Sequence, residues 1–244
     1  MKTSLLTGSA ILALSASGAL AADLGGGSDY YAPPAESASY APSGVFGDIH
    51  LSATYFGIDG EDDWLANIGG VVVVPFGNGW NAALEADAGY LFEGEDWVAA
   101  ATGHVFYLDP AWAAGVFATI TTEDMSSAGV EAAAFINNVD VIGKVEYGFE
   151  DPNFWGLTAA ANLYFNPNTA VSAGVGTAWS DDSDDFQTAS LGVEHRFNSS
   201  PVSGFAELGW TNVVDDTFTA TAGARVVFGA AGSTLQDYNR ANPF

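Results

Sequence analysis

The sequence has 244 residues, of which 30 are acidic and only five are basic, so its formal net charge is −25 at pH 7. So little basic surface excludes nucleic acid as a partner, and the absence of cysteine excludes disulfides, thiolate metal sites and a cysteine nucleophile. Although 48% of the residues are hydrophobic, they are spread in alternation rather than gathered in a run long enough for a membrane helix. The length suits one large β domain.

Residues 1–21 have the features of an export signal. Lys2 supplies the positive start, residues 5–14 form a short apolar run, and Ala19-Leu20-Ala21 is a cleavage site of small residues. We therefore expect residues 1–21 to be a cleaved signal peptide. Residues 22–44 are rich in Gly, Pro, Ser and Ala, which predicts a flexible periplasmic lead-in that buries no core.

From Val45 onward, apolar and polar residues alternate in segments of about ten residues, the length that crosses a bilayer as a tilted strand. In residues 217–228, apolar residues occupy every second position from Phe218 to Phe228 and share one face, whereas Thr219, Thr221, Gly223 and Arg225 lie on the other. One face suits lipid and the other suits water. The expected strands are 45–56, 64–76, 80–92, 97–107, 112–121, 129–136, 139–149, 157–165, 171–179, 186–197, 204–211 and 217–228.

The connections between these segments alternate in character along the chain. Every second connection is acidic, and those between are short Asn, Gly and Pro turns in which only Asp109 is charged. This alternation supports an even strand count. The predicted fold is all-β: a transmembrane antiparallel up-and-down β-barrel of residues 45–228 with 12 strands, 8 or 10 being the alternatives. The neutral turns, both barrel ends and a tail at 229–244 are placed in the periplasm, and the acidic loops outside.

Aromatic residues at the strand ends predict two girdles at the membrane interfaces. A soluble sandwich or lipocalin-like barrel, with its apolar face inward, would need neither the girdles nor an outer-membrane setting. His195 is the only titratable side chain on an expected lipid face. The girdle residues include Trp64, Trp97, Trp179 and Trp210 at the outer ends and Trp80, Trp112 and Phe228 at the inner ends.

The faces opposite the apolar ones carry charged residues, which we expect in the barrel lumen. Arg225 is predicted to pair with Glu207 and, across the barrel closure, with Asp48. Two roles stay open for such a cluster: ion pairs that satisfy interior charges, or a constriction that selects ions. The cluster comprises Asp48, Glu85, Asp87, Glu131, Lys144, Glu146, Glu194, Arg196, Glu207 and Arg225, with Asp140 on the same side.

Most other inward residues are small, which leaves room for water in a 12-stranded lumen. Acids outnumber bases there, so conduction would favour cations. The acidic run at 181–185 lacks the spacing of an EF-hand loop, and we expect no metal site and no cofactor. His50 and Ser52 share a face with Asp48, a spacing that could support a serine nucleophile. That face points away from lipid acyl chains, so an enzyme is not expected.

The chain resembles the small porin-like outer-membrane β-barrel proteins of Gram-negative bacteria over residues 45–228. The resemblance lies in the start Ala22-Asp23-Leu24, in Tyr-Tyr-Ala-Pro-Pro at 30–34, and in Gly-Ala-Arg-Val-Val-Phe at 223–228. It implies that Phe228 ends an assembly signal for the barrel-assembly machinery, and that lipid and lipopolysaccharide surround the barrel. The tail at 229–244 departs from the usual pattern, in which the chain ends at the last strand.

The expected function is passive diffusion of ions or small hydrophilic solutes, with a preference for cations. The alternative is a non-conducting structural or surface-interaction barrel, closed by internal ion pairs or by the tail. The third and least favoured hypothesis is an outer-membrane lipid hydrolase. The sequence gives no basis for predicting the oligomeric state.

Overall fold

The computed structural model describes residues 44–58, 61–92, 96–122, 126–149, 153–180, 185–198, 200–212, 216–229 and 234–244. The expected signal peptide, residues 22–43 of the expected lead-in and most of the acidic loop residues, including 181–184, lie outside this part of the chain. Among the described residues, no helix has the length and hydropathy needed to cross a bilayer.

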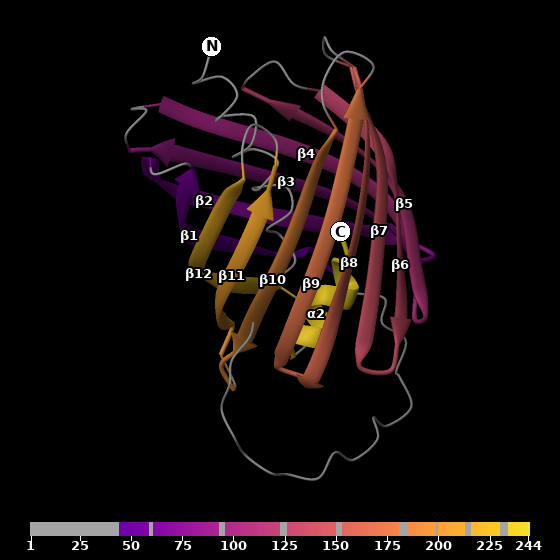
Figure 1. Cartoon of the computed structure of the whole chain (residues 1–244). Coiled ribbons are helices and arrows are strands. Elements are labelled where there is room, and N and C mark those ends of the chain that lie inside the picture. Colours follow the sequence, from indigo (N-terminus) through magenta and orange to yellow (C-terminus); the bar gives the residue numbers. More distant parts are fainter. Residues whose placement is uncertain are drawn as a thin grey trace.

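Twelve antiparallel strands form a closed barrel, in which each strand pairs with its chain neighbours and β12 pairs with β1 (Figure 1). This confirms the predicted fold class and strand number. The strands are β1 (Phe46–Ile58), β2 (Glu61–Gly77), β3 (Trp80–Leu91), β4 (Asp96–Asp109), β5 (Trp112–Thr121), β6 (Ser126–Ile136), β7 (Val139–Gly148), β8 (Phe154–Asn166), β9 (Thr169–Ser180), β10 (Phe186–Arg196), β11 (Val202–Thr211) and β12 (Thr217–Gly229).

The two faces of each strand differ in exposure, as period-two alternation requires. On β3, Leu84 points outward and is 60% exposed, whereas Asn81 points inward and is 2% exposed. The same alternation continues around the barrel and leaves large apolar side chains, such as Ile49 and Val116, exposed on the outer surface. An apolar outer surface around a polar interior is the arrangement of a membrane-spanning barrel.

Several strands extend beyond the apolar segments seen in the sequence. β8 begins at Phe154 rather than at 157, and Trp155 therefore lies opposite Trp179 on β9. β2 begins at Glu61 and includes residues that the sequence placed in an acidic loop. Backbone pairing continues where both faces meet water, so hydrophobic alternation underestimates strand length there.

The short connections use residues that tolerate left-handed backbone conformations. Asn78 has a φ of 54° between Gly77 and Gly79, and Asn137 has a φ of 54° at the turn between β6 and β7. We call the barrel end with these turns the turn end, and the opposite end the loop end. Gly229 ends β12 at the turn end with a φ of 80°. A Cβ atom on Gly229 would lie 2.3 Å from the Val45 carbonyl oxygen, so only glycine fits there.

After β12, the chain forms a short helix, α2 (Leu235–Ala241), inside the turn end of the barrel (Figure 1). Thr234 caps the helix: its hydroxyl accepts a hydrogen bond from the Asp237 amide, and the Asp237 carboxylate accepts one from the Thr234 amide. The helix buries Leu235, Tyr238 and Ala241. The segment expected to be a tail therefore places a helix within the barrel mouth.

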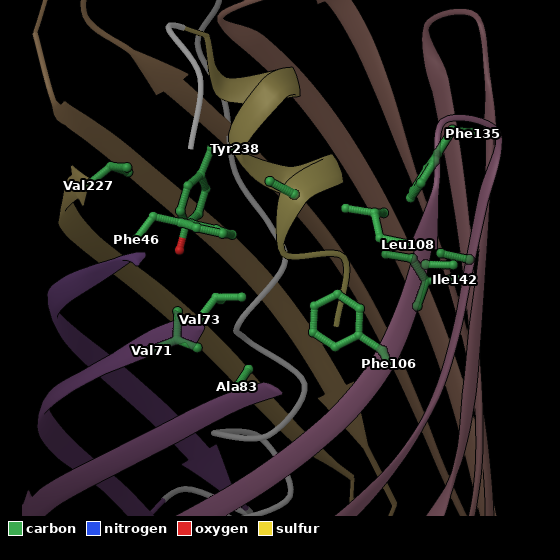
Figure 2. Close-up of a cluster of buried hydrophobic side chains, with 13 residues drawn as sticks. Phe46, Val71, Val73, Ala83, Phe106, Leu108, Phe135, Ile142, Val227 and Tyr238 are labelled. Carbon is green, nitrogen blue, oxygen red and sulfur yellow. The ribbon is translucent and has the colours of Figure 1, made fainter. Parts of the chain in front are cut away.

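The largest apolar cluster surrounds α2. Figure 2 shows Tyr238 extending from the helix towards Phe46, while Phe106 and Leu108 lie on the other side of the helix with Phe135. The rings of Phe46 and Tyr238 meet edge to face, with centroids 6.3 Å apart. Apolar inward residues thus gather where the helix covers them, which fixes α2 against both walls of the turn end.

Candidate functional site in the barrel lumen

Arg225 on β12 is the centre of the first lumen cluster. Its Nη1 donates a hydrogen bond to Glu194 Oε2 on β10 at 3.0 Å, and its Nε lies 3.6 Å from Asp48 Oδ2 on β1. The Ser203 hydroxyl on β11 donates to the other Glu194 oxygen, so the buried carboxylate is bonded on both sides. The expected ion pair between Arg225 and Asp48 is formed.

The expected ion pair between Arg225 and Glu207 is not formed. In the register of β11 and β12, Ser203 lies opposite Arg225 and Glu207 lies opposite Thr221. The small Ser203 side chain leaves room for the guanidinium to pass over β11 and reach β10. Glu207 makes no ion pair with any described residue, and its Oε2 is buried without a hydrogen-bond partner.

His50 extends this cluster from β1 to β3. Its Nδ1 lies 3.1 Å from Asp48 Oδ1, and its Nε2 lies 2.9 Å from Asp87 Oδ1. Asn67 on β2 also donates to Asp87 Oδ1, at 3.0 Å. Because both ring nitrogens of His50 are engaged by carboxylates, no hydrogen bond links His50 to Ser52. The nucleophile and base pair that a serine hydrolase requires is not assembled.

A second lumen cluster lies on the neighbouring strands around Glu131 on β6. His104 Nδ1 on β4 lies 2.9 Å from Glu131 Oε1, and Lys144 Nζ on β7 lies 3.7 Å from Glu131 Oε2. The other ring nitrogen of His104 is 3.9 Å from Glu85 Oε2. Glu146 on β7 instead accepts a hydrogen bond from Ser127 at 3.1 Å. The sequence analysis did not select His104, although it lies on the same face of β4 as the inward Thr102.

Tyr238 connects α2 to the first cluster. Its hydroxyl donates a hydrogen bond to Asp48 Oδ2, and the Arg225 guanidinium lies over its ring, 5.9 Å from the centroid. Burial, together with the negative charge of Asp48, raises the pKa of Tyr238 well above its ordinary value. The phenol is therefore a permanent hydrogen-bond donor to Asp48.

Other contacts fasten both ends of the helix to the turn end. Arg196 donates from Nη1 to the Thr234 carbonyl at 3.1 Å and from Nε to the Ser200 carbonyl at 3.2 Å. Arg240 forms an ion pair with Asp140 on β7, with 2.7 Å between Nη2 and Oδ1. Arg196 thus holds the tail rather than pairing with a lumen carboxylate.

Besides His104, the sequence analysis missed Tyr238 and Arg240. A helix of seven residues is too short to show a period, and the tail lacks the alternation that identifies the strands. One signal was available: Thr234 and Asp237 have the spacing of a capping box, followed by one of the chain's five basic residues.

The predicted girdle residues lie on the outer surface near the strand ends. Trp64 packs on Tyr55 at the loop end, with ring centroids 5.4 Å apart. Tyr107 lies between Trp80 and Trp112 at the turn end, with centroid distances of 5.6 and 5.4 Å. Trp155 is an outward residue that the expected strand 157–165 excluded. Trp97, Trp179, Trp210 and Phe228 complete the placed set, all exposed except the half-buried Trp210.

A cavity of about 30 Å³ lies between α2 and the lumen wall, enough for one or two water molecules. Asp48 and Arg225 of the first cluster line it, together with Asp140, Asn162 and the tail residue Phe244. Among the described residues, no group of three or more His, Asp or Glu side chains is arranged to hold a metal ion.

No protein-family model matches the chain, and no curated protein matches it. Solved structures with a similar fold include the NanC porin, with a TM-score of 0.58 and 10% sequence identity over 73% of this chain and 98% of that chain. The KdgM porin, in complex with disordered oligogalacturonate, has a TM-score of 0.56 and 9% identity over 73% of this chain and 99% of that one. An outer membrane channel from Pseudomonas putida F1 has a TM-score of 0.53 and 12% identity, over 83% and 100%. At these identities the likeness shows a shared fold.

Proposed function

We propose that the chain is an outer-membrane channel of the porin type, through which small hydrophilic solutes diffuse passively with a preference for cations. The observation that carries this proposal is a closed barrel with an apolar outer surface and an acidic lumen wall. In the proposed orientation the turn end faces the periplasm and the loop end faces outside, which suits export by an N-terminal signal peptide.

The charge balance of the lumen supports the cation preference. Arg225 and Lys144 are engaged by Asp48, Glu194 and Glu131. Glu85, Asp87, Glu146 and Glu207 form no ion pair with a described arginine or lysine, so their charge is offset less. A lumen with this excess attracts cations and repels anions. The inward strand positions hold Asp48, Glu85, Asp87, Glu131, Asp140, Glu146, Glu194 and Glu207 against Lys144, Arg196 and Arg225.

The walls away from the two clusters supply room for a solute. The inward residues of β8 to β10 are small and uncharged over much of their length, which leaves lumen space beside the charged wall. The KdgM porin was solved in complex with oligogalacturonate. In this chain, the acidic lumen wall would repel such an anionic oligosaccharide. The small inward residues include Thr158, Ala160, Ser172, Gly174, Gly176, Thr188, Ser190 and Gly192.

A second candidate is a non-conducting barrel with a structural or surface-interaction role. The observation in its favour is α2, which lies in the turn end and is bonded to Asp48 and Asp140. In a conducting barrel, α2 would form the narrowest part of the passage. In a non-conducting barrel, α2 would seal the turn end permanently.

Single-channel recording of the folded, full-length protein in a planar bilayer separates the two. The channel proposal expects stable conductance steps. Barrels that are shown to be folded by their resistance to SDS, but that never conduct, would support the sealed barrel and overturn the channel.

A further inference from the structure

Arg240 occupies a site built from β6, β7 and the turn between them. Its Nε and Nη2 donate to Asp140 Oδ1 at 2.8 and 2.7 Å, and Nη2 also donates to the Asn137 carbonyl oxygen at 2.6 Å. The guanidinium carbon lies 5.5 Å from the centroid of the Phe135 ring. We call these three wall groups the Arg240 seat. A carboxylate, a carbonyl and an aromatic face together select a planar cation with several N–H donors.

The seat holds a buried negative charge that needs a cation. The Asp140 side chain is 3% exposed and pairs with no other basic side chain in the described part of the chain. If α2 moved out of the seat, this carboxylate would lose its counter-charge, which is unfavourable in the partly enclosed mouth of the barrel. A cation from solution would then be drawn to it.

The seat also has an acceptor that Arg240 does not use. Asn162 on β8 lies directly opposite Asp140 in the register of β7 and β8. Its residue is 3% exposed, and its Oδ1 has no hydrogen-bond partner. Both side chains line the small cavity under α2. The contacts of Arg240 do not account for this buried acceptor, which belongs to a side chain that lines the cavity beside the guanidinium.

We propose that the Arg240 seat is a guanidinium-binding site of the lumen, which α2 fills as a tethered ligand and which an alkylguanidinium solute fills when α2 withdraws. The Arg240 side chain is 18% exposed, so the seat borders solvent at the barrel mouth. The inference rests on the proposed function in one respect: the solute reaches the seat through the mouth of a channel. The solutes proposed for this site are therefore alkylguanidinium compounds rather than simple ammonium ions.

Chemical rescue of the full-length Arg240→Ala variant tests the proposal. The temperature at which the folded band is lost on SDS gels should fall relative to the unsubstituted protein. Millimolar methylguanidinium should restore it, because the ion supplies the missing planar donors. Methylammonium at the same concentration should not restore it. A single ammonium nitrogen has no planar face to lie on the Phe135 ring while its N–H groups reach Asp140 and the Asn137 carbonyl. Calorimetric titration of the same variant should show binding of methylguanidinium only.

Two double variants localise the effect. Arg240→Ala with Asp140→Asn should lose the rescue, whereas Arg240→Ala with Glu207→Gln, a lumen carboxylate outside the seat, should keep it. Equal rescue by methylammonium, rescue that survives Asp140→Asn, or no heat of binding would each overturn the proposal. Arg240→Gln serves the same measurements if the alanine variant does not fold.

These readouts do not depend on conduction. Rescue in a barrel that never conducts would overturn the proposed channel and leave the site intact. Conduction without rescue would overturn the guanidinium site and leave the proposed channel intact.

Discussion

Arg225 and Glu207 lie on the adjacent strands β12 and β11 and both point into the lumen, yet only Arg225 has partners of opposite charge among the described residues. Arg225 bonds carboxylates from β1 and β10, while Glu207 on the strand between them has no basic partner. Face alternation correctly predicted that both point inward, because each strand separates lipid from lumen independently. The pairing depends on the stagger between strands, which alternation does not encode. Ser203 rather than Glu207 faces Arg225 for that reason.

Arg225→Met should destabilise the barrel by about 3–5 kcal/mol, because Glu194 would remain buried without its counter-charge and Asp48 would keep only His50 and Tyr238 as partners. Urea unfolding in detergent, followed by tryptophan fluorescence, measures the free energy of unfolding. The double variant Arg225→Met with Glu194→Gln should lose less than the sum of the two single losses. Additive losses would show that the two side chains do not interact.

Glu207→Gln should reduce the cation preference of the channel without loss of stability, since the carboxylate has no ion-pair partner to lose. The ratio of cation to anion permeability before and after substitution is the measurement. Asp109→Asn is the matched control, because Asp109 lies at a turn where its carboxylate accepts a hydrogen bond from the Ala111 amide at 2.9 Å. A selectivity shift as large in the control as in Glu207→Gln would place the effect outside the lumen.

At the scale of elements, the strands and α2 differ in how visible they are in the sequence. Ten-residue alternation identified every strand, although β2 and β8 run further than the apolar pattern. The helix has no such signal, because its surroundings are the barrel interior on both sides rather than lipid and water. Its position follows from tertiary contacts: Tyr238 with Asp48, Arg240 with Asp140, and Arg196 with the Thr234 carbonyl.

Tyr238→Ala should raise the single-channel conductance, because it removes the side chain that binds α2 to Phe46 and Asp48. Tyr238→Phe is the matched control: it keeps the packing on Phe46 and loses only the hydroxyl, so its conductance should rise less. If neither variant conducts more than the parent, α2 does not limit the passage.

Gly229→Val should impair folding of the barrel. The backbone there has a φ of 80°, and the new Cβ would lie 2.3 Å from the Val45 carbonyl oxygen beside the β1 to β12 closure. The left-handed conformation alone costs roughly 1–2 kcal/mol for an L-residue. The yield of SDS-resistant folded protein, compared with that of Gly77→Val at a turn with open space, measures the added cost of the clash. Equal yields would show that the closure tolerates a side chain.

For the whole molecule, the distribution of charge follows from the closed topology. Twelve strands enclose a lumen that holds the acidic side chains, whereas the outward faces carry the apolar side chains that a bilayer would solvate. The few bases are used for ion pairs and for holding the tail. A net negative charge on the lumen wall remains, and this is the physical basis of the proposed cation preference.

The reversal potential of the full-length channel across a potassium chloride gradient tests this account most directly. Potassium should permeate better than chloride, so the reversal potential should lie towards the potassium equilibrium potential, and the shift should shrink at high salt as screening increases. A reversal potential on the chloride side would contradict the account.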